Sequence, residues 1–213
     1  MSSYALALLL LGSTPQVESG SLLVLEGSNK PVRAFTNSQV THVAILMHVG
    51  KNLTFVYEAT PSRVRCVALK KFLAEIHTHD ANRRTNTQVW MMQPKRPYSQ
   101  RELIRMNSYL NSQLGRRYSV KGYVRKRQAD GIHCAEFAST ALTHSGRFAF
   151  RQRYAIDPNE LVQQVRSLHE RPVRISVPNR QADSSFPTQT WRRWLDLQTW
   201  CSWACYEAWR FCW

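Results

Sequence analysis

Two apolar segments separated by a short turn place the tightest limit on what this chain can fold into. Residues 40–47 (Val-Thr-His-Val-Ala-Ile-Leu-Met) are apolar and β-branched, and residues 53–59 (Leu-Thr-Phe-Val-Tyr-Glu-Ala) have the same character. Between them, residues 48–52 contain Gly50, which suits the positive φ angles of a hairpin turn. The two segments therefore predict neighbouring antiparallel strands, with the pairing centred on Gly50.

The remaining patterns predict further strands and then helices. Strands are expected at residues 21–26, 63–69, 88–93 and 173–177, helices at 70–76, 99–115, 131–142 and 158–168, and loops at 77–87 and 116–130. The helix from Ser99 opens with a capping box, Ser99-Gln-Arg-Glu102, in which the serine and the glutamate each satisfy an amide of the first turn. Strands followed by helices indicate an α+β domain with a mainly antiparallel sheet.

Composition divides the chain into a globular domain at residues 20–177 and three flanking segments. Residues 1–19 contain an apolar run, 5–11, that has the length of a signal-peptide core but no Lys or Arg before it. A removed signal peptide and a short helix that caps the domain both remain open, since the run is too short to span a bilayer. Localisation stays open with it: cell envelope or secreted in the first case, cytoplasmic in the second.

The C-terminal part differs in composition from the domain. Residues 178–190 are rich in Pro, Asn, Gln and Ser, which is typical of a linker. Residues 191–213 combine six tryptophans with arginines. A basic, tryptophan-rich tail suits an anionic membrane interface or a partner surface. The alternative is a helix docked on its own domain.

The chain is strongly basic, with 29 Lys and Arg against 14 Asp and Glu and a net charge of +15. Such a surface favours nucleic acid, anionic lipid or acidic polymers, or simply prevents self-association. The chain lacks zinc-finger spacing, an RNP-like motif and a basic region followed by heptads. Nucleic acid is therefore an unlikely partner.

Cys134 is the best candidate for a nucleophile among the five cysteines. Three of the others fall in the last thirteen residues, and Cys66 lies in an apolar alternation that predicts simple packing. Cys134 stands at the start of a predicted helix, where exposed amides and the helix dipole lower the pKa of a thiol. A lone cysteine at such a place is more often a packed small residue, so the role needs a base to support it.

His42 is the histidine best placed to be that base. It interrupts the apolar strand at residues 40–47, where a polar side chain must find a partner. Glu58 interrupts the neighbouring strand in the same way, and pairing centred on Gly50 puts it opposite His42 on one face of the sheet. A carboxylate beside an imidazole orients the ring and stabilises its charged form. The alternative is a buried His-Glu pair with a structural role. His133 is not expected to reach the thiol, because neighbours on a helix point in different directions.

No metal site is predicted. Cys201, Cys205 and Cys212 have no histidine nearby, and His77 and His79 have no obvious third ligand. No metal or organic cofactor is expected for thiol chemistry of this kind.

Several short motifs resemble the YiiX/YebB-like hydrolases, which are circularly permuted members of the NlpC/P60 papain-like superfamily. The resemblance rests on Thr41-His-Val-Ala-Ile45, Tyr57-Glu-Ala59 and Cys134-Ala-Glu-Phe137, with weaker echoes at Gly20-Ser-Leu-Leu-Val24, Gly115-Arg-Arg-Tyr118 and Asp157-Pro-Asn-Glu-Leu161. It covers about residues 18–165, and the order of the motifs is more specific than any one of them. Ser21, Ser119 and Ala135 depart from the family pattern, which leaves substrate preference open.

The resemblance implies a permuted papain-like fold, with the sheet packed against the helix that bears Cys134. It implies a cysteine hydrolase of amide or ester bonds, with catalytic Cys134, His42 and Glu58 and with Tyr118 at the substrate. Peptides, peptidoglycan-like polymers and lipids are the substrate classes of the superfamily, which also contains lipid acyltransferases. The alternative is a non-catalytic module that keeps the fold and binds anionic lipid or a cell-envelope polymer.

Overall fold

Six antiparallel strands form the central sheet. The computed structural model describes residues 17–177 except 29–31, 34–35, 51–52 and 84–85; the predictions for residues 1–16 and 178–213 lie outside this part. The strands are β1 Leu22–Glu26, β2 Val40–Val49, β3 Leu53–Ala59, β4 Val64–Ala68, β5 Gln88–Met92 and β6 Val173–Ile175, in the order β4-β3-β2-β1-β5-β6. The predicted α+β class and antiparallel sheet are confirmed.

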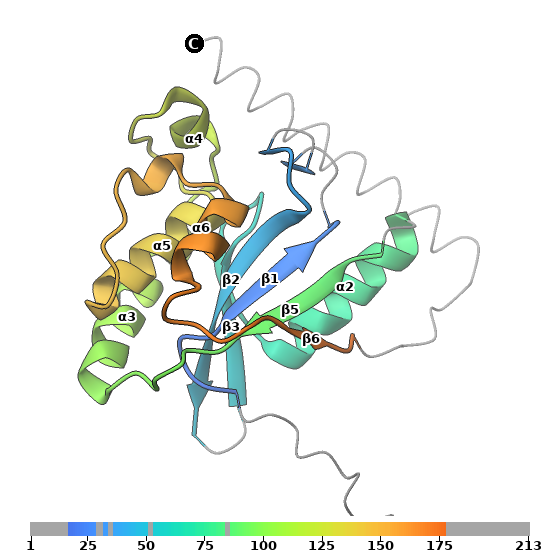
Figure 1. The fold of residues 1–213 in the computed structure, drawn as a ribbon. Coiled ribbons are helices and arrows are strands. Elements are labelled where there is room, and N and C mark those ends of the chain that lie inside the picture. The colour runs from blue at the N-terminus through green and yellow to red at the C-terminus, as the bar shows by residue number, and fades with distance from the viewer. Residues whose placement is uncertain (1–16, 29–31, 34–35, 51–52, 84–85, 178–213) are drawn as a thin grey trace, which may run out of the picture.

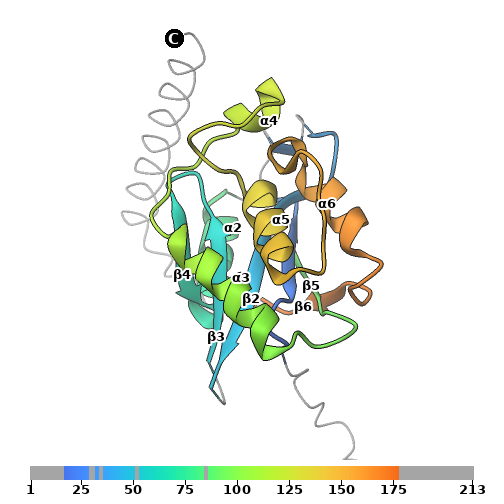
Figure 2. The ribbon, with the colours of Figure 1, turned by 90° about the vertical axis from the view of Figure 1, so that its left-hand side faces the viewer.

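Helices cover both faces of this sheet (Figures 1 and 2). Helix α2 (Leu69–Arg83) lies on one face, and α3 (Gln100–Ser112), α5 (Cys134–Ser145) and α6 (Pro158–Val165) lie on the other. Two short elements, α4 (Lys121–Arg125) and the 3-10 helix η2 (Arg153–Ala155), flank α5. No helix in the described part of the chain is long and apolar enough to cross a membrane.

The two covered faces explain why β2 is apolar at nearly every position. Val43, Ile45 and Met47 belong to the core shared with α3, α5 and α6, whereas Ala44 and Leu46 belong to the core under α2. A strand buried on both faces shows a continuous apolar run in place of an alternating pattern. The polar interruption at His42 is therefore unusual within this strand.

The hairpin pairs two residues away from the predicted register. The ladder runs through Val49 opposite Leu53, so Ile45 lies opposite Tyr57; pairing centred on Gly50 would place Ile45 opposite Phe55. The turn is shorter than the predicted 48–52 because β2 continues to Val49. A shift of two residues leaves every side chain on its predicted face, because the side-chain period of a strand is two.

Two predicted loops contain helix. Helix α2 continues through residues 77–83, and α4 lies within 116–130. Phe72, Leu73 and Ile76 supply the buried positions of α2, and the turns beyond them are polar. A helix needs apolar residues only where it meets the sheet, so polarity beyond Ile76 did not mark its end.

Helix α3 begins as predicted, with the complete Ser99–Glu102 capping box. It ends at Ser112, and Leu114, predicted to be on its buried face, is exposed. The buried positions are Met106 and Leu110, which pack beside α5.

Candidate active site

Cys134 is the first residue of α5 and faces the core between that helix and the sheet, with 5% of its surface exposed. His133 is the N-cap: its backbone is extended, and its Nδ1 accepts a hydrogen bond from the Glu136 amide at 3.4 Å. The amides of Cys134 and Ala135 donate to no described residue. The nucleophile candidate therefore sits beside unused donors at the positive end of a helix dipole.

A close approach between two segments fixes the chain just before Cys134. The Ile132 amide donates to the Arg117 carbonyl at 3.0 Å, and the Ser119 amide donates to the Ile132 carbonyl at 3.3 Å. Gly131 permits this approach, because a Cβ there would lie 2.3 Å from the Ser119 Cβ. Tyr118 forms the backbone bridge with Ile132 and is half-buried beside the core. Its predicted contact with substrate stays a prediction.

His42 and Glu58 meet as the sequence predicted, although not directly opposite each other. His42 Nε2 lies 2.8 Å from Glu58 Oε2. An irregularity in the β1–β2 ladder adjoins His42: Leu25 pairs with His42 and Glu26 with Val40, which leaves Thr41 as an extra residue. Such bulges redirect neighbouring side chains. The Thr41 hydroxyl holds this bulge by donating to the Leu25 carbonyl at 3.3 Å.

His42 also reaches the thiol. The pKa of His42 and the pKa of Cys134 each respond to the other group, and because Glu58 engages Nε2, Nδ1 is the ring nitrogen left to face the sulfur. Burial alone would lower the pKa of His42, but the hydrogen bonds and negative charges of Cys134 and Glu58 together raise it above its usual value. The side chain of His42 keeps 17% of its surface exposed, so a reacting group can approach it.

The pKa of Cys134 moves in the opposite direction. Burial would raise it, but hydrogen bonds and charges from His133 and His42 outweigh burial and hold the thiol pKa below its usual value. The lowered thiol pKa and the raised imidazole pKa together favour a thiolate–imidazolium pair at neutral pH.

Glu58 is itself held by an arginine that the sequence reading missed. Arg65, opposite Glu58 on β4, donates from Nε to Glu58 Oε1 at 2.8 Å and from Nη2 to Glu75 Oε2 on α2 at 2.7 Å. Burial would raise the pKa of Glu58, but His42 and Arg65 lower it overall. Glu58 therefore stays ionised although its side chain is buried. The opposite charges on facing strand positions were the available signal.

His133 is the second residue that the sequence reading missed. The prediction that it points away from the thiol was wrong, because His133 is the cap of α5 and not part of its helical turn. The ring is buried, its Nε2 lies 3.0 Å from the Tyr154 carbonyl, and it helps to hold the pKa of the adjoining Cys134 thiol below its usual value. Two imidazoles thus flank one thiol.

Within the described part of the chain, neither a second cysteine nor a metal site competes with Cys134 as a reaction centre. Cys66 is half-buried, and burial raises the pKa of its thiol. Across the described ranges, no group of three or more His, Cys, Asp or Glu side chains could hold a metal ion.

Comparison with known proteins is consistent with this geometry. Residues 16–168 match the model of a family described as permuted papain-like amidase enzymes, YaeF/YiiX, C92 family. Among solved structures, the chain resembles the metalloprotein YiiX from Escherichia coli O157:H7, with a TM-score of 0.52 and 14% identity, over 76% of this chain and 98% of that one. At this identity the likeness concerns the fold alone. No curated protein matches the chain.

Proposed function

This chain belongs to the permuted papain-like amidase family, and on that premise we propose that it hydrolyses an amide bond with Cys134 as the nucleophile. His42 serves as the general base and acid. Glu58 orients the His42 ring and stabilises its protonated form. The observation that carries the proposal is the continuous path of contacts from the Cys134 thiol through His42 to the ionised Glu58. Such an arrangement supplies an activated nucleophile together with an imidazolium that can later donate its proton.

The reaction runs in two halves. The Cys134 thiolate attacks the amide carbonyl, and the resulting oxyanion accepts hydrogen bonds from first-turn amides of α5, among them those of Cys134 and Ala135. The C–N bond then breaks, and the His42 imidazolium gives its proton to the departing amine. Water, deprotonated by His42, attacks the acyl-thioester, releases the carboxylic acid and restores the thiol.

Glu58 and Arg65 act on His42 and not on the substrate. The Glu58 carboxylate fixes the ring through Nε2 and stabilises its positive charge. Arg65 keeps Glu58 ionised and ties it to Glu75. Ester bonds can be cleaved by the same steps. Peptides, peptidoglycan-like polymers and lipids each contain a suitable carbonyl. The mass of the acyl group trapped on Cys134 would show which of these classes is the substrate.

Alkylation by iodoacetamide tests the nucleophile without a known substrate. Peptide mapping by mass spectrometry gives the rate at each cysteine, and Cys66 is the internal control because burial raises its pKa. We expect Cys134 to react faster than Cys66 at pH 7. We expect His42→Ala to slow the alkylation of Cys134 by about tenfold or more, because the pKa of the thiol returns toward its ordinary value.

His48→Ala is the matched control, since His48 lies on the same strand and its Nδ1 is 3.1 Å from the Thr54 hydroxyl, away from the thiol pair. This variant should leave the Cys134 rate unchanged. Equal reactivity of Cys134 and Cys66, with no effect of His42→Ala, would overturn the proposal and favour a non-catalytic module on the same fold.

A further inference from the structure

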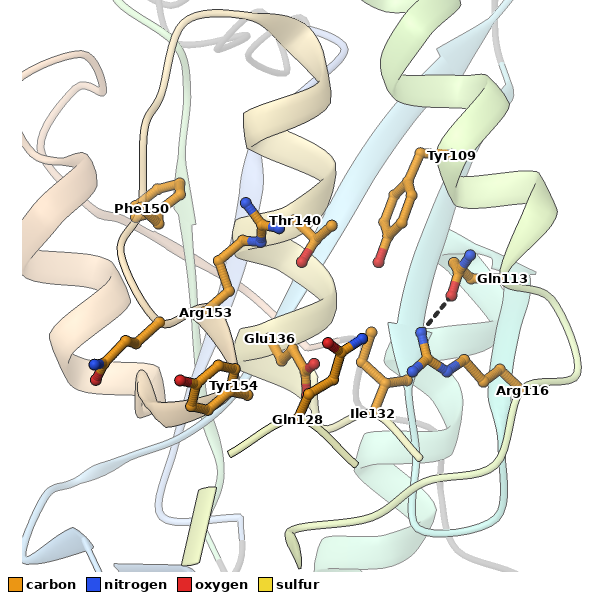
Figure 3. A pocket seen from close by; sticks show the side chains of 11 residues that line it. Tyr109, Gln113, Arg116, Gln128, Ile132, Glu136, Thr140, Phe150, Arg153 and Tyr154 are labelled. Atoms are coloured by element: carbon orange, nitrogen blue, oxygen red, sulfur yellow. Dashed lines mark hydrogen bonds between the residues drawn. The ribbon is translucent and has the colours of Figure 1, made fainter. Parts of the chain in front are cut away.

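A polar pocket lies beside α5, and its lining does not include Cys134, His42 or Glu58 (Figure 3). Its walls come from residues 109–116 at the end of α3 and beyond it, from α5, from residues 128–132 and from residues 150–154, and it encloses about 410 Å³. Glu136 and Thr140, four residues apart on α5, form part of its wall. Cys134 and Ala138 belong instead to the core beneath the helix. The pocket is large enough for a small ligand and is distinct from the reaction centre.

The pocket contains opposite charges that do not pair with each other. Glu136 is mostly buried, and no ion pair joins it to Arg153 within the described part of the chain. The nearest basic side chain is His133, with Nε2 3.8 Å from Oε2, and this ring is neutral while its Nδ1 accepts from the Glu136 amide. The Arg153 guanidinium forms no hydrogen bond or ion pair with any described residue, yet its charge acts on Glu136.

The second arginine of the pocket behaves differently. Arg116 donates to the carbonyls of Asp130 and Gly131 and, at 2.8 Å, to Gln113 Oε1. It holds the wall of the pocket, and its donors are largely engaged by the protein. Glu136 and Arg153 therefore form the charge pair that is open to a ligand.

Backbone strain marks the segment that presents Arg153. Gln152, which also lines the pocket, has φ 47° and ψ 52°, the left-handed region that a residue with a side chain rarely adopts. Strained residues of this kind gather at ligand sites, where the fold holds them against their preference. Here the strained residue directly precedes η2, which begins at Arg153.

We propose that this pocket binds a free α-amino acid, whose ammonium group pairs with Glu136 and whose carboxylate pairs with Arg153. An α-amino acid carries both charges on adjacent atoms, so one small molecule can bridge two protein charges that do not reach each other. Phe150 and Ile132, which also line the pocket, provide apolar surface for its side chain. A charge-assisted contact at each end supplies both orientation and affinity.

Titration calorimetry of the full-length protein with L-alanine, acetate, methylammonium and inorganic phosphate tests the proposal. We expect saturable binding of L-alanine, and binding at least about tenfold weaker, roughly 1.4 kcal/mol, for each of the other three. Acetate or phosphate binding as tightly as L-alanine would overturn the proposal in favour of a simple anion site. Absence of saturable L-alanine binding would overturn it as well.

Two charge-removing variants locate the site. Glu136→Gln and Arg153→Gln should each weaken L-alanine binding by about tenfold or more. Arg151→Gln is the matched control, because Arg151 is an exposed neighbour that does not line the pocket. Equal binding by Arg151→Gln and Arg153→Gln would place the ligand elsewhere. Binding that survives in Cys134→Ala separates this site from the proposed amidase chemistry.

Discussion

Cys134 and His42 shift each other's pKa in opposite directions, and this sets the pH range of the thiol. The thiol pKa lies below its usual value because two imidazoles contact it, and the His42 pKa lies above its usual value because the thiolate and Glu58 contact it. The ion pair is therefore present between the lowered thiol pKa and the raised imidazole pKa. Because the two groups are coupled, these limits belong to the pair.

The first prediction concerns the pH dependence of Cys134 alkylation. In the wild-type protein the rate should rise through the lowered thiol pKa and already be near its plateau at neutral pH. In His42→Ala the rise should move upward, toward the ordinary thiol pKa of about 8.5. The test is the rate of Cys134 alkylation, measured by peptide mapping between about pH 4 and pH 10 in steps of about 0.5 pH unit. Superimposable profiles of the two proteins would contradict it.

The residues of the site differ in how readily the sequence reveals them. His42 and Glu58 stand out because each interrupts a strand that is otherwise apolar, and Cys134 because it begins a helix. Arg65 lies in an alternating strand, where a charged residue is unremarkable until its cross-strand partner is known. His133 was missed because its direction depends on where α5 begins, and helix boundaries are the least certain part of a sequence reading.

At the level of elements, the start of α5 depends on the cap that His133 provides. Its ring accepts from the Glu136 amide, contacts the thiol and lies 3.0 Å from the Tyr154 carbonyl. Capping and thiol activation are therefore properties of one side chain, and substitution can separate them.

The second prediction compares His133→Asn with His133→Ala. Asparagine is a good N-cap, so it should preserve the helix start, whereas alanine should cost about 1 kcal/mol of stability. Both variants lose the imidazole, and in both the pKa of Cys134 should rise. Thermal unfolding measures the first effect and the pH profile of alkylation the second. Equal thiol pKa values in wild type and His133→Asn would limit His133 to capping.

The third prediction concerns the approach of residues 117–119 to residues 131–132. Gly131→Ala places a Cβ 2.3 Å from the Ser119 Cβ and 2.9 Å from its amide nitrogen. We expect a loss of about 1–3 kcal/mol in unfolding free energy, measured by denaturant titration, together with slower alkylation of Cys134. Gly122→Ala on α4 is a milder control, since its nearest neighbour is the Arg127 carbonyl oxygen at 3.3 Å.

Adding Ser119→Gly to Gly131→Ala should restore part of the lost unfolding free energy, because it removes the Cβ atom that clashes. A double-mutant cycle measures the interaction between the two positions. Additive effects would show that the two residues do not compete for the same space.

Element types could be predicted from the sequence more reliably than element ends. Hydrophobic spacing revealed the six strands and the helices that carry buried faces. The end of α2 was missed because its last turns are polar, and the hairpin register was missed because several turn lengths fit the same glycine. Both depend on contacts with distant parts of the chain, which local patterns do not contain.

For the whole molecule, two carboxylates with lowered pKa values tie separate elements together. Glu58 links β3 to β2, β4 and, through Arg65, α2. Glu102 on α3 accepts from Arg147, just beyond α5, at 2.7 Å from Nε and 2.8 Å from Nη2. Hydrogen bonds from Arg147 are the largest cause of the lowered pKa of Glu102, and His42 and Arg65 outweigh burial at Glu58.

The fourth prediction is that acid destabilises the fold through these two groups. A carboxylate whose folded pKa lies below its unfolded value of about 4.3 contributes stability above that value and loses it as the pH falls through the folded pKa. The melting temperature should therefore fall below about pH 4.3. Glu102→Gln should melt lower at pH 7 and lose less on acidification. An unchanged pH dependence in this variant would exclude Glu102 as a contributor.

The overall architecture was accessible from sequence because motif order, more than any single motif, is specific to the permuted family. The histidine strand, the glutamate strand and the cysteine helix follow one another as the resemblance requires, and the family match covers the same region. The pocket beside α5 was not accessible, because its walls come from four segments that only the folded chain brings together.

The order of these parts along the chain also bears on biosynthesis. His42 and Glu58 lie on adjacent strands of one hairpin, so both are synthesised well before Cys134. Cys134 emerges much later, and until α5 docks on the sheet its thiol has no His42 beside it. An unfinished chain therefore carries an ordinary cysteine. In the proposed mechanism, the activated thiolate therefore forms only after α5 has docked on the sheet.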